Sequence, residues 1–512
     1  MNHRHVLWII LVVLGAVLGG VGSGWAAQPK YGGTLRVALE ADVTGFDPAV
    51  PGLQNYYVNQ NLFNTLVTLD ENLEFVPDLA ESWEVQEQGK VYIFRLRKGV
   101  KFHDGTDFDA AAAKWNLDRI IADGKAPAHR FFANVESSEV VDAHTLKITM
   151  RYPTATLLPA LATNGTGLQI ISPASEKTWG KDVLRHPSGT GPFRFVSWEP
   201  NSRIVFERNP NYFKPGLPYL DRIEYRIMKE GVTRVAALRA GEVDFVNWTP
   251  RESVERLSKD PNVRVLQGPE ASHLYTNFTV TRKPFDDVRV RKALIGYGLN
   301  RSAIAKSAML GYATPSISFV SPGAKGYLDL AELYPYNPER ARALLKEAGF
   351  DEKNPLRYTI MTHGAEPSLP TIATIIKTQM AAIGVEVTVE VIDRPIFLRR
   401  LLRDRDYDQV INMALPFLDV GDRGFVLEQG GLNLPNHNDS RVDELFDQWR
   451  RALDPQAQRT IAEEIQRYVA ENAMYMAICG NPIINAHRAD VKGYSYMRGL
   501  LVMFEQTWID RR

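Results

Sequence analysis

Residues 356–361 (LRYTIM), 371–383 (TIATIIKTQMAAI) and 385–391 (VEVTVEV) place a strand, a helix and a second strand in direct succession. The valines of the last segment alternate with polar residues, as in a strand with two different faces. Gly384 separates helix from strand and is a typical helix stop. A helical crossover between two strands favours a parallel pair, so these segments predict an open, parallel α/β sheet.

The same alternation of elements extends in both directions. Residues 337–340 (NPER) predict a helix start, with a capping asparagine and a proline at the first helical position. A charged helix around 397–402 leads to a predicted strand at 409–415. Residues 223–228, 232–239 and 243–246 repeat the pattern of strand, helix and strand, which favours a second parallel pair. Two α/β lobes are therefore expected, with a mixed α+β subdomain between residues 58 and 189.

Composition and charge indicate the size of the core and the class of partner. The chain has 512 residues, of which 45% are apolar, so it can bury more than one large core. Lys plus Arg and Asp plus Glu both number 60, so no overall field attracts nucleic acid. We therefore expect no nucleic-acid partner.

The first residues have the order of a secretory leader. Arg4 precedes an apolar run over residues 6–21, and small residues end it at Ala26 and Ala27, so we expect cleavage after one of them. A retained membrane anchor is the alternative, because the run is barely long enough to cross a bilayer. Cys479 is the only cysteine, so no cysteine follows the run to receive a lipid. The periplasm of a Gram-negative cell fits this pattern.

Candidate ligand contacts follow from a rule for open α/β sheets, which bind ligands where the carboxyl ends of strands form a crevice. Residues at such ends could supply polar groups or an apolar wall. Trp248 and Phe417 could instead be ordinary core, Asp419 could cap a turn, and His363 could point to solvent. Residues 275–280, at the exit from one lobe, are a candidate hinge, with Asn277 near the floor of the cleft. The full set is Glu40, Asp42, Asn247, Trp248, Asn277, His363, Pro416, Phe417 and Asp419.

Six motifs in a fixed order carry a family resemblance. They are Gly33-Thr-Leu-Arg with Phe46-Asp-Pro48, residues 77–83 (PDLAESW), 94–105 (FRLRKGVKFHDG), 189–193 (GTGPF), 209–213 (NPNYF) and 283–293 (KPFDDVRVRKA). As a set spanning nearly the whole mature chain, they resemble the family 5 extracellular solute-binding proteins, which include the dipeptide, oligopeptide and nickel binders of ABC importers.

The resemblance implies a pear-shaped, two-lobed α/β binding protein that closes by a hinge and hands its ligand to membrane permease subunits. It implies a leader at 1–27, a first lobe from 28–57, 190–274 and 486–512, an inserted subdomain at 58–189, and a second lobe at 275–485. A monomer without a cofactor is expected. The motifs themselves are expected to be mainly structural.

Ligand residues transfer less well from the family. Asp419 lies where peptide binders place the carboxylate for the peptide amino terminus, but Arg423 replaces the proline expected there. His363 lies near the arginine that binds the peptide carboxylate in dipeptide binders, and a histidine is only partly charged near neutral pH. Peptides remain the default ligand. An opine, a sugar derivative, haem or a metal chelate is compatible with the same scaffold.

Catalytic motifs are missing from the sequence. It has no Gly-x-Ser-x-Gly elbow, no phosphate loop and no His-Glu-x-x-His pair, and its histidines are scattered, so no catalytic or metal site is expected. One enzyme hypothesis survives, a secreted glycoside hydrolase that uses paired carboxylates such as Glu40 and Asp419. A periplasmic chaperone-like interaction module is a third hypothesis.

Overall fold

The computed structural model describes residues 28–49, 53–70, 72–124, 128–162, 168–416, 420–495 and 502–511. The predicted leader, together with Phe417 and Asp419, lies outside this part of the chain. Within the described part, no helix is both long enough and apolar enough to span a membrane.

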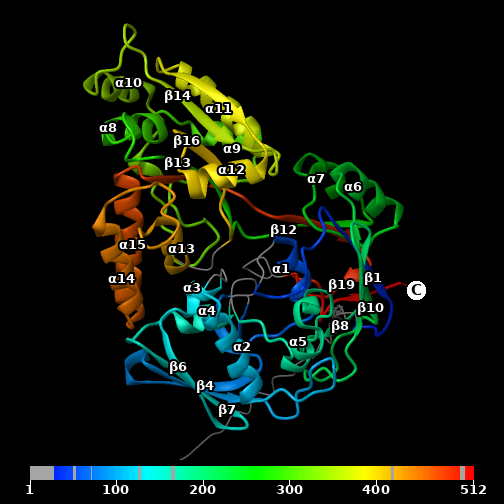
Figure 1. Ribbon diagram of the computed structural model, residues 1–512. Coiled ribbons are helices and arrows are strands. Elements are labelled where there is room, and N and C mark those ends of the chain that lie inside the picture. The colour runs from blue at the N-terminus through cyan, green and yellow to red at the C-terminus, as the bar shows by residue number, and fades with distance from the viewer. Residues whose placement is uncertain are drawn as a thin grey trace, which may run out of the picture.

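The first lobe is built on a seven-stranded sheet in the order β12-β18-β11-β1-β10-β9-β8 (Figure 1). Its central strand β1 (Thr34–Leu39) pairs in parallel with β10 (Arg222–Ile227) and with β11 (Phe245–Val246). Strands at 223–228 and 243–246 are thus confirmed as parallel, but they do not pair directly because β1 lies between them. Each of the other strands pairs antiparallel with its neighbours in the sheet. They are β8 (Phe193–Glu199), β9 (Arg203–Arg208), β12 (Val263–Gln267) and β18 (Ile484–Arg488).

Both faces of β1 are covered by apolar side chains. Leu35 and Val37 pack in one buried cluster with Phe245, whereas Ala38 packs in another cluster with Leu238 of α6 (Gly231–Ala240). A strand covered on both faces has a nearly continuous apolar sequence, as observed here.

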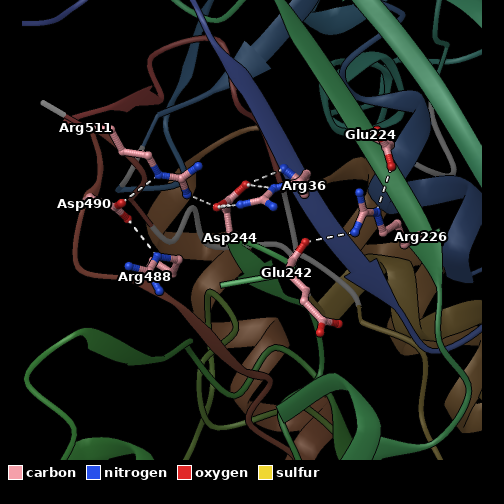
Figure 2. A network of polar contacts seen from close by, with 8 residues as sticks. All are labelled: Arg36, Glu224, Arg226, Glu242, Asp244, Arg488, Asp490 and Arg511. Carbon is pink, nitrogen blue, oxygen red and sulfur yellow. Dashed lines mark hydrogen bonds and ion pairs between the residues drawn. The ribbon is translucent and has the colours of Figure 1, made fainter. Parts of the chain in front are cut away.

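A network of charges ties the end of the chain to this sheet (Figure 2). Asp244 is wholly buried and accepts hydrogen bonds from Arg36 Nε at 2.9 Å and Nη2 at 2.8 Å, and it also contacts Arg511. Arg511 Nε in turn donates to Asp490 Oδ2 at 2.8 Å. Burial alone would raise the pKa of Asp244, but the bonds from Arg36 and Arg511 outweigh it and hold the pKa below its usual value. The C-terminal segment is therefore fastened beside β1 and β11.

An inserted region forms its own sheet and core. The strands are β4 (Ala80–Gln86), β5 (Val91–Leu96), β7 (Thr145–Met150) and β6 (Val135–Asp142), all antiparallel and in that order. Helix α2 (Ala110–Ala122) begins after Asp109, whose carboxylate caps it by accepting a hydrogen bond from Ala112 N at 2.8 Å. Phe94 and Phe102 are buried in this core, as expected for structural motif residues.

The second lobe contains a five-stranded sheet in the order β15-β14-β16-β13-β17. β14 (Arg357–Thr362) pairs in parallel with β15 (Glu386–Val391) and β16 (Gln409–Met413), as the sequence predicts. β13 (His273–Phe278) and β17 (Tyr475–Gly480) join antiparallel to this group. The predicted parallel group is thus confirmed, and the two antiparallel strands that extend it come from the ends of the lobe's sequence.

Helices cover the second sheet. Asn337 Oδ1 accepts a hydrogen bond from Arg340 N at 2.9 Å and caps α10 (Pro338–Glu347), as predicted. The other helices are α8 (Val288–Arg291), α9 (Arg301–Ala308), α11 (Ser368–Ala381), α12 (Arg394–Arg399), α13 (Val420–Leu427), α14 (Ser440–Arg451) and α15 (Pro455–Glu471).

The two lobes have separate apolar cores. Two buried clusters in the second lobe draw all their residues from Leu274 through Cys479, and none of these residues belongs to the first-lobe clusters. The chain crosses between the sheets at residues 268–272, which join β12 to β13, and at 481–483, which join β17 to β18.

The predicted hinge at 275–280 is therefore wrong. Most of that segment is β13, which is wholly buried between two strands of the second sheet. Asn277 likewise lies in the interior of the second lobe. The two crossing segments are called the junction from here on. They lie a few residues before the predicted limits of the second lobe, at 275 and 485.

Candidate functional site

The first-lobe candidates lie at one edge of the seven-stranded sheet. The parallel register pairs Ala38 with Val246, so the next residues of both strands emerge together, and Asn247 N donates to Ala38 O at 3.2 Å. Glu40 Oε1 accepts from Gln54 Nε2 at 3.1 Å, and Oε2 is buried without a hydrogen-bond partner among the described residues. Burial raises the pKa of Glu40, and bonds to its backbone and to Gln54 offset this only in part.

Trp248 is held rigidly beside Glu40. Its indole Nε1 donates to Tyr57 Oη at 2.8 Å, and its backbone N donates to Asn485 Oδ1 at 3.2 Å. Arg234 Nη2 donates to its carbonyl oxygen at 3.1 Å. The backbone φ of 53° at Trp248 is unusual for a bulky residue and is fixed by these bonds. Trp248 also packs against the buried first-lobe cluster, so its ring is held at the strand end.

Asn247 shows the clearest sign of an external partner. The residue is 0% exposed, yet neither Oδ1 nor Nδ2 has a hydrogen-bond partner in the described part of the chain. Buried polar side chains nearly always have one, in the protein, in water or in a ligand. Side chains near the junction share this property; the set, called the junction layer, is Glu40, Asn247, Thr249, Arg251, Glu270 and Asn481, each with at least one such atom.

Glu270 belongs to this layer and packs across the junction. Its Oε1 accepts from Thr314 N at 2.9 Å. Its other oxygen lies so close to Gly480 that a Cβ there would be 1.9 Å away, which explains the glycine. Burial raises the pKa of Glu270. A carboxylate from one crossing segment is thus fitted against the end of the other.

One ion pair connects the strand-end loops of the two lobes. Arg251, the first residue of α7 (Arg251–Ser258), lies four residues after Asn247, and its Nη1 is 3.2 Å from Glu366 Oε1 of the second lobe. The side chains are 16% and 5% exposed, so water screens the pair weakly. Arg251 Nη2 also donates to Asn481 Oδ1 at the junction. The loop after β11 and the loop after β14 therefore face each other.

His363 lies in that same second-lobe loop but is satisfied internally. It is 4% exposed, and Ala365 N donates to its Nδ1 at 3.1 Å, so Nε2 carries the proton and donates to Asn412 Oδ1 at 3.0 Å. Burial lowers the pKa of His363, which keeps the ring neutral at physiological pH. A neutral histidine cannot replace the charge of an arginine.

A second buried histidine, His273, was not singled out from the sequence. His273, at the start of β13, is wholly buried and hydrogen-bonded to Ser321 Oγ at 2.8 Å and Tyr475 Oη at 3.0 Å. Arg423 Nη2 lies 3.1 Å from both ring nitrogens. Burial and the Arg423 charge hold the pKa of His273 well below its usual value. Arg423, which replaces the expected proline, thus anchors α13 to the start of β13.

The remaining predicted residues divide into three groups. The Asp42 carboxylate accepts from Trp198 Nε1 at 3.0 Å and from Asn201 N at 2.6 Å, so it braces the β8–β9 turn. Asn277 donates to Leu434 O at 3.1 Å inside the second lobe. Pro416 is half-buried at the edge of the described region, and Phe417 and Asp419 lie beyond it.

The structure thus brings together Glu40, Asn247 and Trp248 and places the His363 loop opposite them. Sequence reasoning missed Tyr57, Arg234, Arg251 and Glu366. A search for opposite charges in the predicted strand-end loops could have found Arg251 and Glu366. Among the described residues, no group of three or more His, Cys, Asp or Glu side chains is arranged to hold a metal ion.

Comparisons with known proteins agree on the type of protein. The chain matches the family "Bacterial extracellular solute-binding proteins, family 5 Middle" over residues 74–424. The glutathione-binding protein GsiB of Shigella dysenteriae is 29% identical, and the alignment covers 97% of each chain.

Two solved structures are similar over nearly their whole length. The periplasmic binding protein DppA of Helicobacter pylori, in complex with peptide STSA, has a TM-score of 0.82 at 25% identity, covering 94% of this chain and 99% of that one. The binding protein AgaA of A. tumefaciens R10, in complex with agropinic acid, has a TM-score of 0.81 at 26% identity, with the same coverage.

Proposed function

The chain belongs to the bacterial extracellular solute-binding proteins of family 5, and from that premise we propose that it captures a peptide-like solute between its lobes by hinge closure. Its two-lobed fold and family make it the periplasmic substrate-binding component of an ABC importer, working with membrane permease subunits. Its proposed location is the periplasm of a Gram-negative cell, after removal of the leader near Ala26 or Ala27.

The observation that carries the ligand site is Asn247. This wholly buried amide lies at the carboxyl ends of parallel strands and has no hydrogen-bond partner among the residues that the structure describes. It is therefore suited to a ligand with peptide-like donors and acceptors. Glu40 would accept from a donor group of the solute, and Trp248 would supply apolar wall. Pro416, Phe417 and Asp419 would contribute from the second lobe. Asp42, Asn277 and His363 stay outside the proposed site, because each is used within its own lobe.

Closure would follow from the ligand's preference for the form in which the lobes face each other. A solute that contacts both lobes binds that form more tightly and shifts the equilibrium by this difference. Micromolar binding corresponds to about 8 kcal/mol at the standard state. This is enough to favour closure when the open and closed forms differ in free energy by only a few kcal/mol. The proposed division is two lobes, an inserted subdomain at 58–189 and crossings at 268–272 and 481–483, supported by the membership of the three sheets.

Peptide-like compounds are favoured over the other ligand classes because a relative is named as glutathione-binding and a similar structure holds a peptide. An opine is the second candidate, since the similar protein AgaA holds agropinic acid. We propose that the protein performs no chemistry on its ligand. A glycoside hydrolase or a chaperone-like module has no support in the family match.

The test is a thermal-shift panel on the mature protein with reduced glutathione, the tetrapeptide STSA, a dipeptide and agropinic acid. At a ligand concentration of 100 times the dissociation constant, stabilisation should reach about 2.7 kcal/mol. We expect saturable stabilisation by at least one peptide-like compound and its recovery unchanged by mass spectrometry. Stabilisation by none of them, or turnover of a model glycoside, would contradict the proposal.

A further inference from the structure

The inserted subdomain touches the second lobe far from the junction. Arg130 of α3 (His129–Phe132) places its guanidinium 3.8 Å from the ring centre of Phe425 in α13 and 4.4 Å from that of its neighbour Phe131. A cation held between two aromatic faces is attracted by both rings. The contact therefore links a subdomain helix to a second-lobe helix.

A second stack runs in the opposite direction. Here the arginine belongs to the second lobe: Arg451, the last residue of α14, lies 4.5 Å from the ring centre of Tyr152 in the subdomain. Each side thus supplies one cation and one aromatic ring. Reciprocal stacks of this kind fix both the distance and the orientation of the two surfaces.

Backbone groups join the same surface. The carbonyl oxygen of Arg450 accepts from Ala155 N and from Thr154 Oγ1, both at 3.3 Å. The last carbonyls of a helix lack partners within the helix, so the subdomain supplies what the end of α14 needs. Gly89 lies at this surface too, and a Cβ there would come within 3.1 Å of Leu453. Figure 1 shows the end of α14 approaching the four-stranded sheet.

The position of α13 relates this surface to the ligand site. α13 begins at Val420, immediately after the predicted ligand residues Phe417 and Asp419 in the sequence, and Arg423 anchors it to His273. Phe425, half a turn further on, reaches the subdomain. One short helix therefore connects the interior of the second lobe with the subdomain surface.

We propose that these residues form a jaw contact, made of Arg130, Tyr152, Thr154, Phe425 and Arg451, that holds the protein shut at the side remote from the junction and sets how fast a bound solute leaves. The inserted subdomain is then a second jaw, in addition to the first lobe. This inference rests on the proposed function, because a solute must be enclosed for its release to depend on opening.

The experiment measures lobe position directly, with and without solute. Val141→Cys in β6 and Val391→Cys in β15 provide exposed sites for spin labels, and the native Cys479 is buried. Electron–electron distance measurements on the mature protein give the fraction in the short-distance, closed form. The variants are Arg130→Ala with Arg451→Ala, and Phe425→Leu, which keeps apolar bulk but removes the ring.

Arg441→Ala is the matched control, because it removes an arginine of the same α14 that pairs with Glu464 rather than with the subdomain. We expect the double variant to lower the closed-to-open ratio by about tenfold, with Phe425→Leu lowering it less and Arg441→Ala leaving it unchanged. Dissociation of reduced glutathione, followed by stopped flow, should accelerate by a similar factor.

An unchanged closed fraction in the double variant would overturn the jaw contact, as would a wild-type protein that shows no short-distance population under either condition. Failure of reduced glutathione and the rest of the panel to bind would instead count against the proposed function, since the distance measurement without solute still decides whether the contact holds the lobes.

Discussion

Asn247 and Asn277 are the same residue type, both 0% exposed and both in or directly after a strand, yet their surroundings differ. The amide nitrogen of Asn277 donates to Leu434 O at 3.1 Å and to Tyr407 Oη at 3.3 Å within the second lobe, so only its Oδ1 has no partner among the described residues. Neither polar atom of the Asn247 side chain has a partner in the part of the chain that the structure describes.

The difference separates structure from function. A buried amide that is bonded within its own lobe stabilises the fold, whereas one that lacks such bonds costs stability unless something else binds it. In the junction layer, Glu40, Glu270 and Asn481 each combine a hydrogen bond with an unpartnered atom, whereas Asn247 has no side-chain bond among the described residues. Substitutions in the two regions should therefore have opposite signatures.

The largest effect is expected at the ion pair that joins the two regions. Glu366→Gln leaves the Arg251 guanidinium without a counter-charge in the closed form, and breaking such a buried pair costs about 3 kcal/mol. Closure should become harder by that amount, so affinity for the best solute of the panel should fall about 100-fold. Titration calorimetry measures this.

The control is the double variant Arg251→Gln with Glu366→Gln, which removes both charges. It should bind more tightly than the single variant, because no unpaired charge remains to be buried. Equal affinities for the wild type and Glu366→Gln would show that the lobes do not depend on this pair.

Asn277→Ala should have the next largest effect, on stability alone. It leaves Leu434 O and the Tyr407 hydroxyl with fewer partners, so the free energy of unfolding should fall by about 2 kcal/mol. Urea denaturation of the mature protein checks this value. Loss of ligand affinity without loss of stability would place Asn277 in the site after all.

Much of this architecture was accessible from sequence because it is local. The alternating valines of β15, the Asn337 cap and the strand at 356–361, observed as β14, depend on nearby residues and were predicted correctly. The role of β13 was not, because its partners β16 and β17 come much later in the chain. A buried strand was consequently taken for a hinge.

The candidate site was predicted to the same extent. The strand-end rule found Glu40, Asn247 and Trp248 at a shared sheet edge, because parallel strands end together. It could not separate Asp42, which turns back to Trp198, from its neighbours, since that bond depends on a strand far along the chain. The pairing of Arg251 with Glu366 requires the relative position of two lobes, which no local pattern contains.

The pH dependence of stability gives a smaller effect from the interior. The pKa of His273 lies well below the ordinary 6.5, so as pH falls through 6.5 the unfolded chain takes up a proton that the folded chain does not. Stability is therefore lost on acidification, by about 1.4 kcal/mol between pH 7.5 and pH 5.5 from this residue. Urea unfolding at both values should show a smaller loss for His273→Gln. An identical loss in both proteins would contradict the assignment.

The most direct test of the central claim is the affinity of Asn247→Ala and Asn277→Ala for the solute that stabilises the wild type most, measured by titration calorimetry. We expect Asn247→Ala to bind at least about fivefold more weakly while unfolding at nearly the wild-type urea concentration, and Asn277→Ala to bind as the wild type does. Wild-type affinity in Asn247→Ala would show that the junction layer does not contact the solute.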